Sequence, residues 1–394
     1  MDARLTEEQQ QIQETARDFL EANDGIDFAR RKMEGDDDVV DEVWSEISDL
    51  DYTAITIPLE YNGLGEGMVY LSALLEELGR YAMPGPFPET MAFCVPLIDE
   101  LGSEEQKEEV FTAIADDERM LSFALYDDRN EEVPETIQLS ADRVDDGYQL
   151  SGTKTLVPYG GEVDQLLVAA RTQDATEWGG ISLFLVDADD ADTTRLESLD
   201  RTRPMYDVEL DGVVVDEDAL LGPRHGGGDA LSRAIDRFNV AICAMMVGAA
   251  DRAVELSTEH GTERHQYGQP IGRFQAVKHR IAEMWMDKEH SRSLTYYAAW
   301  AIDADEPDAA RAVSTAKAYA GENLHRVFGD DIWNHGGMGF TWDHDGHIYM
   351  KQAKAWQNFL GSPEYHLDRV ADIRDYSSRT LPDYPELTID PYQG

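Results

Sequence analysis

The chain is organised around ERHQYGQPIGRFQ, the stretch from Glu263 to Gln275. A pattern of apolar residues at helical spacing runs into this stretch, and a second such pattern runs out of it. Gly268, Pro270 and Gly272 interrupt the pattern between them, because glycine and proline are the residues that most often end helices. The stretch therefore predicts a turn between two long helices.

Helical patterns also fill the two ends of the chain. Near the N-terminus, Thr6 and Gln9 have the spacing of a capping box. A strong pattern covers residues 68–81, and another helix is expected to start near Ser103. In the second half we expect four long helices, at residues 229–263, 273–303, 307–328 and 343–357.

The middle of the chain has the period of β-strands instead. Short alternating runs, separated by Gly and Asp clusters, predict strands at residues 120–125, 147–150, 165–170, 181–186 and 208–215. Gly226, Gly227 and Gly228 then predict a linker. We expect an α+β protein with three parts: an N-terminal α-helical domain, a middle antiparallel β-domain and a C-terminal helical bundle, at residues 1–118, 119–222 and 229–394.

Three motifs resemble those of the acyl-CoA dehydrogenase family. The stretch from Glu263 to Gln275 resembles the family's flavin-contacting turn, and HGGMGF, at residues 335–340, resembles its glycine motif. IPLEYNGLG, at residues 57–65, is similar to its Pro-Glu-x-x-Gly-Gly-x-Gly loop. The resemblance spans nearly the whole chain and implies the acyl-CoA dehydrogenase fold, FAD as cofactor and α,β-dehydrogenation of an acyl-CoA substrate. It also implies electron-transfer flavoprotein as the electron acceptor.

In this family the turn and the glycine motif contact FAD held by a neighbouring subunit. A planar guanidinium such as that of Arg264 suits a bidentate contact with pyrophosphate, although the same residue type also forms salt bridges at helix ends. Tyr267 offers a flat ring face, and Gly336 and Gly337 let the backbone approach a ligand closely. The resemblance assigns cofactor contacts to Arg264, Gln266, Tyr267, Phe274, Gln275, Trp333, His335, Gly336 and Gly337.

The family's catalytic base does not match this sequence. Its usual glutamate falls at Leu360, and the position used by a minority of members falls at Phe238. Neither side chain accepts a proton, so we predict no catalytic residue at these positions. The nearest carboxylates in sequence, Asp236 and Glu364, are alternatives as a displaced base or as ordinary surface acids.

The middle domain departs from the family as well. The family's Thr-Glu-Pro-x-x-Gly-Ser-Asp loop falls at Tyr126-Asp127-Asp128, and its Trp-Ile-Thr stretch falls at Leu156-Val157-Pro158. The chain thus resembles the non-catalytic subunit of heterotetrameric acyl-CoA dehydrogenases, with a related subunit or a second copy of itself as partner. The alternatives are a self-sufficient dehydrogenase and a flavin-free acyl-CoA-binding or scaffold protein.

Charge and composition exclude several other classes. The chain carries 33 basic and 80 acidic residues, a net charge of −47, which repels nucleic acid. Such an excess suggests a halophilic protein, because salt screens the repulsion. Cys94 and Cys243 are the only cysteines and do not form a disulfide framework. With neither a signal peptide nor an apolar run of membrane-spanning length, a cytoplasmic location and no membrane partner are expected.

The tract after the glycine motif also raises the question of a metal site. His344 and His347 stand among Asp343 and Asp345, and all four are metal-ligating residue types. Their spacing matches no familiar ligand set, and the family has a loop entering a helix here. The sequence therefore predicts no metal site.

Overall fold

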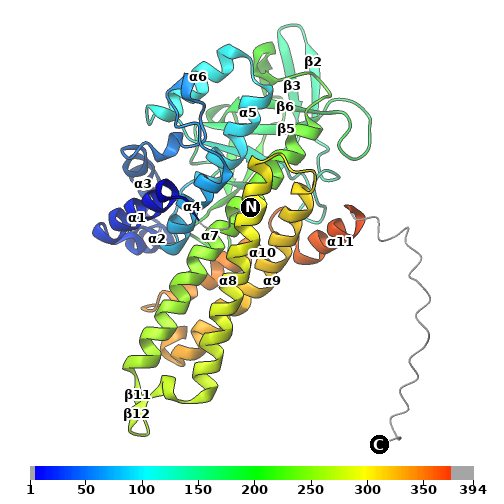
Figure 1. The fold of residues 1–394 in the computed structure, drawn as a ribbon. Helices are drawn as coiled ribbons and strands as arrows, with labels where there is room; N and C mark the ends of the chain where they lie inside the picture. The colour runs from blue at the N-terminus through cyan, green and yellow to red at the C-terminus, as the bar shows by residue number, and fades with distance from the viewer. Residues whose placement is uncertain (1–4, 374–394) are drawn as a thin grey trace, which may run out of the picture.

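The sheets lie at one side of the molecule in this computed structural model, which describes residues 5–373 (Figure 1). The N-terminal helices lie beside the sheets, and the long C-terminal helices run away from them. Residues 1–4 and 374–394, which belong to the predicted N- and C-terminal domains, lie outside the described residues. The three domain boundaries themselves stay predictions. No helix within residues 5–373 is long and apolar enough to cross a membrane.

The N-terminal part consists of short helices around a shared apolar core. Thr6 and Gln9 form the predicted capping box, and Ser103 and Gln106 form a second one. The helices are α1 (Glu7–Ala22), α2 (Gly25–Glu34), α3 (Val39–Ser48), η1 (Tyr52–Ala54), η2 (Leu59–Tyr61), α4 (Met68–Arg80), η3 (Pro88–Cys94), α5 (Val95–Leu101) and α6 (Glu104–Ala115).

Two sheets make up the middle of the chain. The larger has the order β10-β6-β5-β2-β3-β9, with β1 beside β5, and the smaller has the order β4-β8-β7. Their strands are β1 (Leu121–Ala124), β2 (Ser140–Val144), β3 (Gly147–Ser151), β4 (Thr153–Pro158), β5 (Gln165–Arg171), β6 (Ile181–Asp187), β7 (Asp192–Arg195), β8 (Met205–Glu209), β9 (Val214–Asp216) and β10 (Leu220–Leu221). The 3-10 turns η4 (Ala188–Asp190) and η5 (Glu217–Ala219) flank β6 and β10.

The sheets differ from the prediction in three respects. β1 pairs with β5 in parallel, so the β-region is mixed rather than wholly antiparallel; the long excursion through β2, β3 and β4 allows this pairing. The single strand expected at 208–215 is two strands, because Gly212 turns the chain at a φ of +89°. Strands β2, β4, β7 and β10 were not predicted.

Five α-helices form the C-terminal part as far as residue 373, and a small hairpin joins α7 to α8 at the end far from the sheets (Figure 1). Helix α9 is longer than predicted and continues to His335, and α11 was not predicted. The elements are α7 (Gly228–Glu263), β11 (His265–Gln266), β12 (Gln269–Pro270), η6 (Ile271–Arg273), α8 (Gln275–Asp303), α9 (Ala309–His335), η7 (Met338–Phe340), α10 (Gly346–Asn358) and α11 (Pro363–Ile373).

Glycines allow close backbone contacts where the three parts of the chain meet. Gly227 donates its N–H to the Ile181 carbonyl at 2.9 Å, so the predicted linker is held against β6. Helices α4 and α7 cross where Gly79 faces Met245 and Gly248 faces Glu76. A Cβ at Gly248 would lie 1.7 Å from the Glu76 carbonyl oxygen, which only glycine avoids.

Candidate functional site

The hairpin between α7 and α8 presents its side chains to solvent. Strands β11 and β12 pair in antiparallel fashion, and Tyr267 and Gly268 form the turn with φ of +51° and +79°. Tyr267 is 93% exposed and packs edge-on against Phe274, with ring centroids 6.0 Å apart. Arg264 and Gln266 are also exposed, and Arg264 has no ion pair within residues 5–373. These polar and aromatic groups are free to contact another molecule.

The glycine motif lies at the same end of the bundle, after α9. The ring of His260, near the end of α7, lies 4.5 Å from that of His335, at the end of α9. Gly336 has a φ of +62°, and a Cβ on it or on Gly337 would meet no described atom within 4 Å. The backbone of this loop is therefore open to a ligand.

Trp333 and His335, two of the predicted cofactor contacts, differ in solvent exposure. The Trp333 ring is 50% exposed, and the Arg280 guanidinium lies 3.7 Å from its centroid. The His335 side chain is buried instead and faces Asp331 in the preceding turn of α9. Gln275, the first residue of α8, is exposed. The structure thus brings most of the predicted contacts to one end of the bundle.

Large apolar side chains are exposed around these residues. They come from the hairpin, from α8 and from the end of α9 with its following loop, and each is at least 45% exposed within the described chain. We call this set the bundle-end patch: Tyr267, Trp285, Met286, Trp333, Met338, Phe340 and Trp342. Exposed apolar side chains in this number mark a protein-contact surface.

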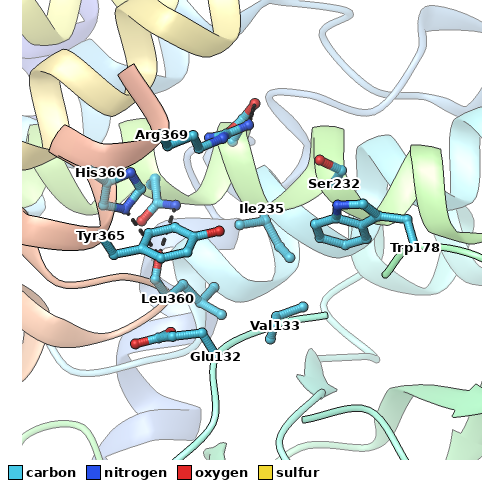
Figure 2. A pocket seen from close by; sticks show the side chains of 11 residues that line it. Glu132, Val133, Trp178, Ser232, Ile235, Leu360, Tyr365, His366 and Arg369 are labelled. Carbon is cyan, nitrogen blue, oxygen red and sulfur yellow. Dashed lines mark hydrogen bonds and ion pairs between the residues drawn. The ribbon is translucent and has the colours of Figure 1, made fainter. Parts of the chain in front are cut away.

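A separate cavity of about 240 Å³ lies where α7, α11 and a loop of the β-region meet (Figure 2). This is below the range of roughly 300–1,000 Å³ usual for small-molecule sites. Leu360 lies beside the cavity, and its carbonyl accepts a hydrogen bond from Asn239 at 3.4 Å. The lining residues are Glu132, Val133, Trp178, Ser232, Ile235, Asp236, Asn239, Leu360, Tyr365, His366 and Arg369.

An aromatic cluster fills the space next to this cavity. The Phe359 ring centroid lies 6.2 Å from that of Phe123 and 6.0 Å from that of Phe238. The Arg203 guanidinium covers the Phe359 ring at 4.6 Å and pairs with the buried carboxylate of Glu89. A closely packed cluster of this kind leaves no room for another ring system.

Of the two carboxylates considered from the sequence, only Asp236 lines the cavity. Both of its oxygens accept hydrogen bonds from Arg369, at 2.5 and 2.9 Å. Burial raises the pKa of Asp236, and Arg369 opposes that rise by favouring the charged form. Glu364 is exposed and is not among the lining residues.

A third carboxylate, Glu132, was missed by the sequence reading. Burial raises its pKa, with a smaller opposing contribution from a Tyr126 hydrogen bond at 3.4 Å. A carboxylate with a raised pKa beside a cavity is a candidate proton acceptor. Glu132 lies in the loop between β1 and β2, far in sequence from Leu360, so spacing alone gave no signal.

Comparison with known proteins assigns the chain to a family. Its sequence matches the models described as the acyl-CoA dehydrogenase N-terminal domain, over residues 6–118, and C-terminal domain, over residues 225–373. Acyl-CoA dehydrogenase FadE27 of Mycobacterium tuberculosis is 30% identical over 343 residues, covering 84% of this chain and 87% of the relative. The chain belongs to the acyl-CoA dehydrogenase family.

Solved structures have the same architecture as this acyl-CoA dehydrogenase family member. Butyryl-CoA dehydrogenase from Megasphaera elsdenii aligns with a TM-score of 0.85 at 24% identity, covering 94% of this chain and 99% of that chain. A chain of the ChsE4-ChsE5 complex from Mycobacterium tuberculosis aligns with a TM-score of 0.86 at 27% identity, covering 97% and 100% of the two chains. The predicted α+β acyl-CoA dehydrogenase fold is confirmed.

Family membership also confirms FAD as the cofactor and places the chain among oxidoreductases that act on CH–CH bonds. Some of the described residues suit FAD binding, and others do not. The exposed hairpin and the glycine motif supply a guanidinium, aromatic faces and free backbone N–H groups, which suit a dinucleotide. The hairpin that carries Arg264 and Tyr267 lies at the end of the bundle far from the chain's own sheets (Figure 1).

The positions that would cradle FAD within this chain fit poorly. Pro158 is buried, has no N–H, and its carbonyl already accepts a hydrogen bond from Ser122 at 2.6 Å. Asp127 accepts the N–H of Leu139 and pairs with Lys154 at 2.7 Å. These groups are engaged within the protein, and the two aspartates, Asp127 and Asp128, would repel a pyrophosphate.

Proposed function

We propose that this chain is the subunit without a catalytic base in a hetero-oligomeric, FAD-dependent acyl-CoA dehydrogenase. The related partner subunit supplies the glutamate and most of the FAD site. This chain supplies Arg264, Gln266, Tyr267, Phe274, Gln275, Trp333, His335, Gly336 and Gly337, the last two through the loop that follows α9. The assembly is a heterotetramer, a dimer of dimers, with an acyl-CoA thioester as substrate and electron-transfer flavoprotein as acceptor.

The proposal rests on the difference in solvent exposure between Tyr267 and Leu360. Tyr267, in the turn that resembles the family's cross-subunit contact, is 93% exposed. Leu360, at the family's base position, is 4% exposed and lies beside a cavity of only about 240 Å³. The turn that would contact another chain's cofactor is accessible to solvent. The position of the family's base within this chain is buried and carries no carboxylate.

Two further observations support a partner chain. The bundle-end patch exposes aromatic and methionine side chains, the residue types enriched at protein interfaces. In addition, the ChsE4-ChsE5 structure to which this chain is similar is named as a complex of two different chains. An interface over the patch would bury side chains that water otherwise surrounds.

Co-expression with a family member that keeps its base glutamate tests this proposal. The pair should contain FAD and oxidise an acyl-CoA thioester, whereas this chain alone should do neither. Arg264→Ala in the pair should lower FAD retention at least about 10-fold, because a charge-assisted contact to pyrophosphate is lost. Arg143→Ala, in an exposed ion pair with Glu217 on the β-region, is the matched control and should leave FAD bound.

A second candidate function is favoured by the position of Glu132. If Glu132 takes the α-proton, the chain is a self-sufficient dehydrogenase, and Glu132→Gln abolishes turnover while Asp236→Asn and Glu364→Gln do not. Turnover by the chain alone that is lost in Glu132→Gln would replace the subunit proposal. A flavin-free scaffold would show neither flavin nor turnover in any pairing.

A further inference from the structure

One carboxylate and two imidazoles meet at the C-terminal end of α9. Asp331 and His335 lie four residues apart, on one face of the helix. The chain then turns through η7 and brings His344 back, so that the rings of His335 and His344 are 4.1 Å apart between centroids. One ligand-type atom from each of the three residues lies within 4.8 Å of the others.

Asp331 is buried with half of its carboxylate unsatisfied. The side chain is 0% exposed, and Oδ1 accepts a hydrogen bond from the Ser257 hydroxyl at 2.6 Å. Oδ2 has no hydrogen-bond partner among residues 5–373. Burying a carboxylate oxygen without a partner is costly, so a cation at Oδ2 would stabilise the folded chain.

The two imidazoles are held as metal ligands usually are. His335 Nδ1 lies 2.9 Å from the Asp331 carbonyl oxygen and 3.2 Å from Asp331 Oδ1, and a hydrogen bond of this kind to a carbonyl is common at metal-binding histidines. The ring also bonds to the Leu256 backbone, a hydrogen bond that Zn²⁺ would have to replace if it bound the other ring nitrogen. His344 Nδ1 accepts the Gly346 N–H at 3.1 Å, so this nitrogen is unprotonated. A Cβ at Gly346 would lie 2.8 Å from Asp331 Oδ2 and 3.0 Å from His344 Nδ1, so glycine keeps this side of the cluster open.

We propose that Asp331, His335 and His344 bind one zinc ion. Two imidazole nitrogens and a carboxylate oxygen suit Zn²⁺, with bonds of about 2.0–2.2 Å and ligand atoms about 3.4 Å apart around a tetrahedral ion. The three ligand atoms, now within 4.8 Å of one another, would move closer together on binding the ion. A water molecule completes the coordination, or His260 does, whose ring centroid lies 4.5 Å from that of His335.

The zinc ion has a structural role in this arrangement. It joins the end of α9 to the loop that carries Gly336 and Gly337, and Ser257 connects both to α7. The ion would hold the glycine loop in one conformation. The test of this inference uses this chain alone and needs no partner subunit. In the proposed assembly the buried His335 side chain would bind the ion, and His335 would contact the cofactor only through its backbone.

Cobalt substitution in the full-length protein tests the site. The protein is purified in high salt, stripped with a chelator and titrated with Co²⁺. One equivalent should give the visible absorption of four-coordinate Co²⁺, and Zn²⁺ should displace it. The many surface carboxylates offer only oxygen ligands and favour octahedral geometry, so their Co²⁺ absorbs weakly and does not imitate the site.

Three variants sharpen the result. Asp331→Asn and His344→Gln should each lower the affinity for Zn²⁺ at least about 10-fold, since each removes a direct ligand. His347→Gln is the matched control, because His347 lies in the same tract but stacks on Trp342 at 4.8 Å; its affinity should equal that of wild type. Far-ultraviolet circular dichroism establishes that each variant is folded.

Either of two results would overturn the zinc site. The first is the absence of the four-coordinate Co²⁺ absorption in wild type, which would leave Asp331 and His335, 3.2 Å apart, as an ion pair only. The second is unchanged affinity in both Asp331→Asn and His344→Gln. The wild-type spectrum decides the matter even if a variant fails to fold.

Discussion

At the scale of single residues, a leucine stands where the family has its catalytic glutamate. Leu360 occupies the family's base position, in a backbone conformation with a φ of +53°. It is fixed by two hydrogen bonds to its carbonyl, from Asn239 and from His366 at 3.2 Å. These contacts hold the backbone of the position at which the family carries its base.

Leu360→Glu should consequently destabilise the chain and leave it inactive on its own. The new carboxylate would be almost fully buried, and we expect a loss of about 2–4 kcal/mol in the free energy of unfolding. Denaturant unfolding measures that loss. Leu367→Glu, at a 59% exposed position on α11, is the control and should change stability by less than about 0.5 kcal/mol. Dehydrogenase turnover by isolated Leu360→Glu would show that only the base is missing.

At the scale of elements, glycine determines how closely α4 and α7 approach. Gly79 and Gly248 face the partner helix's backbone, and any side chain there meets carbonyl oxygens that cannot move aside. This crossing joins the N-terminal helices to the C-terminal bundle, and through α7 it sets the position of the cavity.

Gly248→Ala should therefore push the helices apart and cost at least about 3 kcal/mol, as strong overpacking does. Gly329→Ala makes a matched comparison, because Gly329 also lies within a helix but a Cβ there meets no described atom within 4 Å. That variant should be neutral or more stable by up to about 1 kcal/mol, from helix propensity. Thermal unfolding of both proteins gives the answer; equal losses would refute the close-contact explanation.

His366, near the start of α11, makes the free energy of unfolding depend on pH. His366 is buried, and burial, followed by the charges of Lys317 and Arg369, lowers its pKa to about 3. The unfolded chain binds a proton at His366 below about pH 6.5, whereas the folded chain does not until about pH 3. The contribution of His366 to stability thus falls as the pH decreases from about 6.5 toward 3.

His366→Gln should remove that dependence. Between about pH 6.5 and 4.5, wild type should lose about 2 kcal/mol more than the variant, since one pKa unit corresponds to about 1.4 kcal/mol. Unfolding curves at several pH values test this, with His265→Gln, exposed in the hairpin, as control. Parallel pH profiles for wild type and His366→Gln would contradict the assignment.

Elements with their own periodic pattern could be predicted from the sequence, and elements held by distant contacts could not. The helices around Glu263 to Gln275 and the apolar strands β5 and β6 follow from spacing. β7 is exposed along its length and exists because β8 pairs with it. Likewise, Asp331 meets His344 only because η7 reverses the chain, and Glu132 reaches Leu360 only through the folded β1–β2 loop.

At the scale of the whole molecule, the excess of 47 negative charges opposes the compact state. We expect the free energy of unfolding to rise between roughly 0.1 M and 1 M KCl, as the Debye length falls from about 10 Å to about 3 Å. Urea unfolding at each salt concentration measures the change. Screening also weakens the surface ion pairs, so a constant or falling stability would mean that those pairs outweigh the net repulsion.

The central claim, that FAD is held between this chain and a partner, also concerns the whole molecule. The most direct measurement is the visible absorbance of the purified chain, alone and then co-purified with a base-containing family member. We predict a colourless chain alone and a flavin spectrum with turnover in the complex. A spectrum of one FAD for each copy of the isolated chain, with acyl-CoA oxidation, would contradict the claim.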